Sequence, residues 1–172
     1  MRIGWIGLHT EGIDPCEAVL AGGWKLETII THQSEVARKR SGEASDEYKR
    51  IGAAHNVPVV EITDINSDSS RELLQSLKLD VVFVIGWNQI IRDEVLRTAN
   101  IGMIGTHASL LPHNRGSAPI NWTIIRGEAS TGNTLIWLAP GVDTGDMIDQ
   151  MSFPITPYDT CRTLYERTVL PL

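Results

Sequence analysis

The segment from Asp80 to Ile85, which reads DVVFVI, limits the possible folds of this chain more than any other feature. A strand that is apolar along nearly its whole length is typical of the centre of a parallel sheet, where helices cover both faces. Strand-like and helix-like segments alternate around it, which predicts a doubly wound, mostly parallel α/β sheet. The expected strands are Arg2–Leu8, Trp24–Thr31, Val57–Ile62, Asp80–Ile85 and Ile101–Thr106. The expected helices are Asp14–Ala21, Asp46–His55, Ser69–Leu77 and Asp93–Arg97.

The last third of the chain has a different character. Asn133–Leu138 and Met147–Ile155 have the composition of two strands, and the turn Pro140–Gly145 separates them. Thr160–Val169 has the pattern of a closing helix. We therefore expect a single domain over residues 1–172, with an antiparallel extension of the sheet. The abrupt ending VLPL also fits a chain truncated at its C-terminus.

Composition argues against several classes of partner and location. The formal net charge is −6 and the densest basic cluster is the short run Arg38–Arg40, which we interpret as a solvated loop, so no nucleic-acid-binding surface is visible. Two cysteines, Cys16 and Cys161, lie far apart and predict buried thiols in a reducing compartment. No apolar run approaches the roughly 20 residues of a membrane span, and no signal peptide precedes the first strand. We expect a cytoplasmic protein with no membrane partner.

His107 and Asp143 are the candidate catalytic residues. His107 follows a strand-like run and opens a loop interrupted by Pro and Gly, and Asp143 lies in a second turn between two glycines. Catalytic groups concentrate on loops that a rigid scaffold holds in place. Taken alone, His107 would be interpreted as an ordinary loop histidine and Asp143 as a turn former. A meeting of the two would instead create a general acid/base pair.

The same region carries a family resemblance. Residues 107–122, HASLLPHNRGSAPINW, followed by PGVDTGD at 140–146, resemble the catalytic domain of the formyltransferase family. This family includes methionyl-tRNA formyltransferase, glycinamide ribonucleotide formyltransferase and the sugar-nucleotide N-formyltransferases. The similarity covers nearly the whole chain in the order of its elements, and it implies a Rossmann-like formyltransferase fold. It favours the catalytic interpretation of His107 and Asp143.

The resemblance implies a formyltransferase that uses 10-formyltetrahydrofolate as co-substrate, an amine as acceptor and no metal. The family positions an Asn, a His and an Asp at the reacting atoms; the last two correspond to His107 and Asp143. The Asn position is Gly105 here, which is a departure from the family pattern. Loss of one hydrogen-bond donor to the oxyanion costs about 100- to 1000-fold in rate. Asn88, the Thr106 hydroxyl and a backbone N–H near Gly105 are candidate replacements.

The resemblance also implies two groups of binding residues. The expected folate-binding residues are Gly86, Trp87, Asn88, Ile90, Ile91, Gly141, Val142 and Asp143. The expected substrate loop contains Ser109, Leu110, Leu111, Pro112, Arg115 and Gly116. Within this loop, Arg115 either orders the backbone or binds a phosphate of the acceptor. The tryptophans other than Trp87 are expected in the core: Trp5, Trp24, Trp122 and Trp137.

The identity of the acceptor is less constrained. The RGSAPINW segment resembles the tRNA and sugar-nucleotide branches of the family, but this acidic chain should bind tRNA weakly. We therefore expect a nucleotide-linked amino sugar as acceptor. The alternatives are a methionyl-tRNA formyltransferase catalytic domain, if the chain is truncated, and a degenerate folate-binding protein without turnover, which Gly105 would favour. A homodimer is compatible with the resemblance, whereas an NAD-dependent oxidoreductase is disfavoured because no GxGxxG motif is present.

Overall fold

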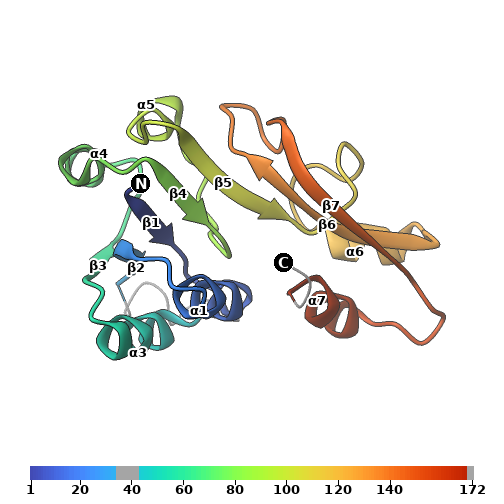
Figure 1. Cartoon of the computed structure of the whole chain (residues 1–172). Coiled ribbons are helices and arrows are strands. Elements are labelled where there is room, and N and C mark those ends of the chain that lie inside the picture. The colour runs from blue at the N-terminus through green and yellow to red at the C-terminus, as the bar shows by residue number, and fades with distance from the viewer. Residues whose placement is uncertain (34–42, 170–172) are drawn as a thin grey trace. The chain divides into compact units, whose positions relative to one another are not determined.

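The computed structural model describes residues 1–33 and 43–169 (Figure 1). The basic cluster at 38–40 lies outside the described residues. The strands are β1 (Ile3–Ile6), β2 (Leu26–His32), β3 (Val59–Ile62), β4 (Val81–Val84), β5 (Gly102–His107), β6 (Ser130–Trp137) and β7 (Met147–Pro154). The helices are η1 (Thr10–Gly12), α1 (Ile13–Ala21), α3 (Ser45–His55), α4 (Asp68–Leu77), α5 (Asp93–Leu96), α6 (Pro119–Ile125) and α7 (Cys161–Val169).

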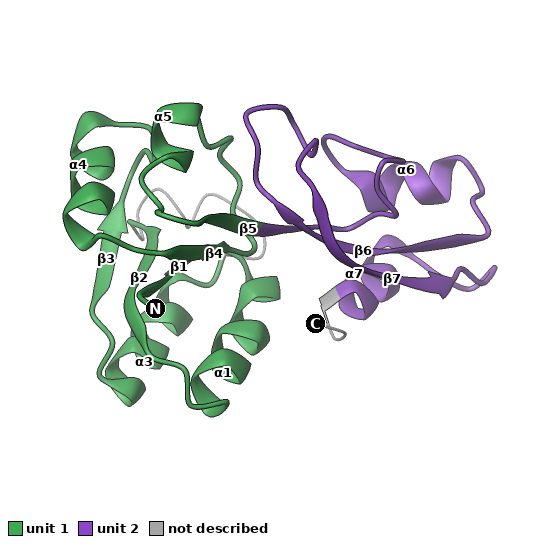
Figure 2. Cartoon of the chain, turned by 45° about the horizontal axis from the view of Figure 1, so that its top comes forward, with its two compact units in different colours: residues 1–104 green, residues 105–172 purple. Residues whose placement is uncertain are grey.

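The expected fold class is confirmed. The strands form a seven-stranded sheet in the order β3-β2-β1-β4-β5-β6-β7. β1 pairs in parallel with β2 and β4, and β2 pairs in parallel with β3. β6 and β7 are antiparallel, as predicted for the end of the chain. The chain divides into two compact units, Met1–Ile104 (unit 1) and Gly105–Leu172 (unit 2), shown in Figure 2.

Unit 1 is the doubly wound part. Helices α1 and α3 cover one face of its strands and α4 and α5 cover the other (Figure 2). Tyr48 of α3 is fully buried, and its hydroxyl donates to the carbonyl of His9 at 3.1 Å. Burial raises the pKa of this phenol far above its usual value. A Cβ at Gly7 would overlap the Tyr48 ring, so glycine is required where the first strand ends.

Unit 2 is built on the β6–β7 pair, whose register runs from Ser130 opposite Pro154 to Ile136 opposite Met147. Helix α7 is fixed to β6, because Leu164 is fully buried and Asn133 donates to the Thr168 carbonyl at 2.8 Å. Helices α6 and α7 contact one another.

The sequence pattern does not predict helix α6. Ala118, its N-cap residue, has a left-handed backbone (φ 56°) and offers no side-chain acceptor to the first turn. The polar capping residue that usually marks the start of a helix is therefore missing. Pro119 at the first helical position is the remaining signal, because proline is favoured there.

Three predictions of burial are wrong. Trp24 and Trp122 are 55% and 48% exposed rather than in the core, although Trp5 is buried as expected. Arg126 lies over the Trp122 ring at 5.4 Å from its centroid, a contact that stabilises an exposed aromatic ring. Cys161 is exposed, whereas Cys16 is buried and its burial raises the pKa of the thiol to about 12.

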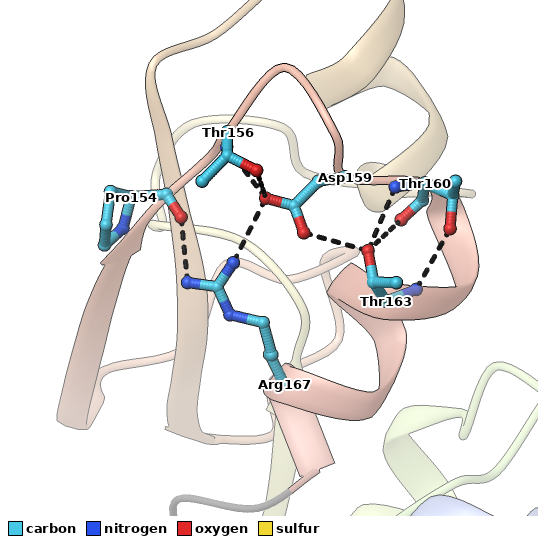
Figure 3. Close-up of polar contacts among 6 residues, drawn as sticks. All are labelled: Pro154, Thr156, Asp159, Thr160, Thr163 and Arg167. Carbon is cyan, nitrogen blue, oxygen red and sulfur yellow. Dashed lines mark hydrogen bonds and ion pairs between the residues drawn. The ribbon is translucent and has the colours of Figure 1, made fainter.

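Asp159 connects the end of β7 to helix α7 (Figure 3). Its carboxylate accepts hydrogen bonds from the backbone N–H and hydroxyl of Thr156 at 2.7 and 2.9 Å, and from the Thr163 hydroxyl at 2.9 Å. Arg167 approaches the same carboxylate at 3.2 Å and donates to the Pro154 carbonyl at 2.8 Å. The donors, led by the Thr156 backbone N–H, hold the pKa of Asp159 below its usual value.

Substitution Asp159→Asn should remove a pH-dependent contribution to the stability of unit 2. Because the pKa of Asp159 is lower in the folded protein than the ordinary value of about 4, its contribution is present above pH ~4 and disappears as the pH falls through the folded pKa. The variant should therefore unfold at lower urea concentration than the wild type at pH 7, and the difference should shrink at pH 3. Glu166→Gln, at an exposed position of the same helix, is the control. If the stability of Asp159→Asn and of the wild type changed with pH by the same amount, the role assigned to Asp159 would be contradicted.

Candidate active site

His107 is the last residue of β5, and the geometry of the strand sets the direction of its side chain. Successive side chains of a strand point to opposite faces, and burial alternates along β5 in the same way. Gly105 and His107 therefore lie on one face, and Thr106 lies on the other. A side chain at position 105 would point to the same side as the imidazole. The Thr106 hydroxyl points away from it, which makes this residue a poor replacement for the missing Asn.

The imidazole of His107 is nearly covered, with 10% of the side chain exposed. Its Nε2 lies 2.8 Å from the backbone carbonyl oxygen of Asn114. A carbonyl oxygen can only accept a hydrogen bond, so Nε2 carries a proton. Nδ1 is consequently the ring nitrogen that can gain or lose a proton during a reaction.

Asp143 faces that second nitrogen. Its Oδ2 lies 3.4 Å from Nδ1 of His107, which is longer than a hydrogen bond but close enough for an ion pair with a protonated ring. The same Oδ2 accepts the backbone N–H of Gly116 at 2.8 Å. Asp143 has a positive φ of 50°, a conformation that Asp adopts more readily than most residues. The two predicted side chains thus meet within unit 2, and their catalytic role stays a prediction.

The substrate loop is anchored to β6. The hydroxyl of Thr134, fully buried, donates to the carbonyl of Ser109 at 2.6 Å and accepts the backbone N–H of Leu111 at 3.2 Å. Gln150 of β7 donates to the Leu111 carbonyl at 3.0 Å, and the Ser109 hydroxyl donates to the His113 carbonyl at 2.7 Å. Ser109 and Leu111 are therefore buried structural residues. Sequence reasoning missed Thr134 and Gln150, because neither belongs to a motif and only strand pairing brings them to the loop.

The outer residues of the loop have a different environment. Arg115 is exposed, and its guanidinium makes no hydrogen bond or ion pair within the described part of the chain. Leu110 is half-buried and Pro112 is exposed. Gly116 has a φ of 93°, so glycine is favoured at this bend. This environment gives no support to the interpretation of Arg115 as a structural tether and leaves the guanidinium available to a ligand.

The turn that carries Asp143 is closed by backbone contacts. The N–H of Trp137 donates to the carbonyl of Asp146 at 2.9 Å, and a Cβ at Gly145 would overlap the Trp137 carbonyl oxygen. A Cβ at Gly141 would meet the Thr144 hydroxyl. Val142, at the tip, is 50% exposed. Glycines 141 and 145 therefore keep the turn tight, and two of the predicted folate-binding residues, 141 and 142, lie beside Asp143 in the chain.

The other predicted folate-binding residues, at 86–91, belong to unit 1. Gly86 has a φ of 64°, and its carbonyl accepts the N–H groups of Leu8 and His9 at 3.1 and 3.0 Å. The ring of Trp87 stacks on His32, with centroids 4.6 Å apart. Among the described residues, the indole nitrogen of Trp87 and both amide atoms of Asn88 are buried without a hydrogen-bond partner.

Gln89 fixes the second half of this segment to the backbone of residues 63 and 65. Gln89 accepts the N–H of Ile65 at 2.8 Å and donates to the carbonyl of Thr63 at 3.0 Å. Ile90 is 68% exposed and Ile91 is buried.

Across the described residues, no group of three or more His, Cys, Asp and Glu side chains is arranged to hold a metal ion. None of the described helices has the length and apolar character that a membrane span requires.

Thr134→Val should loosen the loop that follows His107. Valine matches threonine in shape but removes the hydroxyl, which leaves the Ser109 carbonyl and the Leu111 N–H without their partner in a buried place. We expect a loss of about 2–3 kcal/mol in the free energy of unfolding, since each buried group left unpaired costs about 1–3 kcal/mol. Urea denaturation measures the change, with Ser152→Ala on exposed β7 as the control. A loss equal to that of the control would show that the hydroxyl does not anchor the loop.

Comparison with known proteins adds an independent finding. Residues 20–170 match the sequence model of the family described as Formyl transferase. The methionyl-tRNA formyltransferase of Koribacter versatilis (strain Ellin345) is 36% identical over 168 residues, which cover 97% of this chain and 54% of that protein. The methionyl-tRNA formyltransferase of Desulforamulus reducens is 31% identical over 167 residues, covering 97% and 53%. The chain therefore spans about half the length of these curated relatives.

Solved structures share the fold at lower identity. Phosphoribosylglycinamide formyltransferase from Anaplasma phagocytophilum has a TM-score of 0.80 at 20% identity, covering 98% of this chain and 79% of that one. An N-formyltransferase from Helicobacter canadensis, in complex with folinic acid and dTDP-3-aminofucose, has a TM-score of 0.75 at 21% identity, covering 98% and 58%. At these identities the likeness shows the fold alone.

Proposed function

Because the chain belongs to the formyl transferase family, we propose that it transfers a formyl group from 10-formyltetrahydrofolate to an amine, with His107 and Asp143 as the catalytic pair. The 3.4 Å contact between these side chains, within the motif that carries the family resemblance, is the observation on which the proposal rests. It joins an acid/base residue at the end of β5 to a carboxylate in a turn of the same unit.

The reaction requires a proton donor for one atom and a proton acceptor for another. Attack of an amine on the formyl carbon creates negative charge on the formyl oxygen and leaves the nitrogen with a proton to lose. Nε2 of His107 donates to Asn114, so the second proton of the imidazolium form lies on Nδ1, and this proton is the one that can stabilise the oxyanion. Asp143 balances the charge of the ring and accepts the amine proton, directly or through water.

We propose residues 86–91 as the pterin-binding part of unit 1. They follow the carboxyl end of the central strand β4, the edge at which parallel sheets of this class bind ligands, and Ile90 is exposed there. Within unit 2, the exposed Val142 and the neighbouring Gly141 flank Asp143 in the chain, which supports their proposed role in folate binding.

Two acceptors are proposed. The exposed guanidinium of Arg115 suits a phosphate, which supports a nucleotide-linked amino sugar as acceptor. The curated relatives, at 31% and 36% identity, are methionyl-tRNA formyltransferases, which supports methionyl-tRNA as the second candidate. A homodimer and a cytoplasmic location stay predictions.

The purified chain should release tetrahydrofolate from 10-formyltetrahydrofolate only when a suitable amine is present. The assay compares nucleotide-linked amino sugars with methionyl-tRNA. In whichever reaction is found, His107→Gln should lower kcat/KM by about 100-fold or more, because general acid/base catalysis contributes about 10²- to 10⁴-fold. His55→Gln, at the exposed end of α3, is the matched control and should be neutral. Equal rates for His107→Gln and wild type would remove His107 from the mechanism.

Gly105→Asn should raise the rate. The new amide lies on the same face of β5 as the imidazole and restores a donor for the oxyanion, so we expect a gain of about 10- to 1000-fold in kcat. Folate binding is measured in parallel by fluorescence titration. Folate binding without formyl transfer to any acceptor, in both the wild type and Gly105→Asn, would support a degenerate binding protein instead.

A further inference from the structure

The backbone carbonyl of Asn114 is the hydrogen-bond acceptor for Nε2 of His107. Its carbonyl oxygen is 2.8 Å from that nitrogen, and its backbone is left-handed, with a φ of 54°. This conformation is unfavourable for a residue with a side chain, although Asn tolerates it better than most. The direction of the carbonyl therefore depends on whatever keeps residue 114 in this conformation.

A polar network holds the side chain of Asn114. Its amide nitrogen donates to both carboxylate oxygens of Glu128 at 3.0 Å and to the hydroxyl of Thr123 at 3.2 Å. Thr123 is buried, and its hydroxyl donates to the same carboxylate at 3.2 Å. The amide oxygen of Asn114 accepts from the guanidinium of Arg126. Hydrogen bonds to charged groups are stronger than neutral ones, so both ends of the amide are firmly held.

We propose that Glu128 is a positioning residue for His107, which acts through the side chain of Asn114 to hold the Asn114 carbonyl against Nε2. This inference rests on the proposed function, since it assigns a role in the same reaction. Within the described residues, Glu128 makes no hydrogen bond or ion pair with the imidazole. The path runs from the Glu128 carboxylate to the Asn114 amide and from the Asn114 carbonyl to Nε2.

The consequence for His107 is a fixed tautomer. With Nε2 protonated and held, Nδ1 stays directed at Asp143. Removal of the Glu128 carboxylate takes away two acceptors of the Asn114 amide nitrogen and leaves it only the Thr123 hydroxyl, which then loses its own acceptor. The contact of Arg126 with the amide oxygen remains, so the amide is held at one end instead of two. Residue 114 can then leave the left-handed conformation, and its carbonyl no longer fixes the proton on Nε2.

The test observes His107 directly in ¹⁵N-histidine-labelled protein by long-range ¹H–¹⁵N NMR. We expect the neutral ring of the wild type to carry its proton on Nε2, and Glu128→Ala to give a mixture of both tautomers. Glu128→Gln keeps one acceptor for the Asn114 amide and should retain most of the wild-type pattern. Ser130→Ala, at the exposed start of β6 and two residues from Glu128, is the matched control. Melting temperatures confirm that each variant is folded.

Kinetics give the second readout. In Glu128→Ala, kcat should fall on the order of 10-fold while KM for the folate stays nearly constant, because a displaced catalytic group affects the chemical step. Asn114→Gly keeps the backbone conformation accessible but removes the amide, so it should show the same loss. Adding Glu128→Ala to Asn114→Gly should cause no further loss, as expected for two residues acting on one path.

Unchanged His107 spectra in folded Glu128→Ala would overturn the inference. It would also be overturned if Glu128→Ala lowered kcat as much in the Asn114→Gly variant as in the wild type. The NMR measurement needs no turnover. A wild-type protein without formyl transfer would therefore refute the proposed function, while the spectra would still decide whether Glu128 positions the ring.

Discussion

The turn from Asn114 to Gly116 is the constraint on which the candidate site depends. Its first residue offers a carbonyl to one nitrogen of His107, and its last residue offers an N–H to the carboxylate that faces the other nitrogen. Both residues have positive φ values, of 54° and 93°. A shift of this turn would disturb both partners of the imidazole at once. The loop that leads from His107 to this turn is attached to β6, because the Thr134 hydroxyl bonds the backbone of Ser109 and Leu111.

The sequence predicted the architecture well where the physical signal is local. The apolar segment around β4 indicates burial on both faces, and the alternation of strand-like and helix-like segments indicates parallel pairing. Helix α6 was beyond this reasoning because its N-cap residue carries no capping side chain. Trp24 and Trp122 show the limit of composition, since a large aromatic side chain also finds a stable place at the surface.

The sequence likewise predicted some residues of the candidate site and missed others. His107 and Asp143 were predicted together because a motif connects them, not because their separation in sequence requires contact. Asn114, Thr134 and Glu128 were missed, because their importance arises only when strand pairing and a left-handed backbone bring them to the loop. The sequence showed that Gly105 departs from the family pattern. The alternation along β5 adds that a side chain at this position would point to the same face as His107.

The two oxygens of Asp143 have unequal surroundings. Oδ2 accepts the Gly116 N–H and faces the imidazole, whereas Oδ1 has no hydrogen-bond partner among the described residues. Oδ1 is therefore the oxygen whose lone pairs no described residue occupies. One carboxylate thus has two different ends: Oδ2 fixes the loop through Gly116, and Oδ1 is the end that the proposed reaction would use to accept the amine proton.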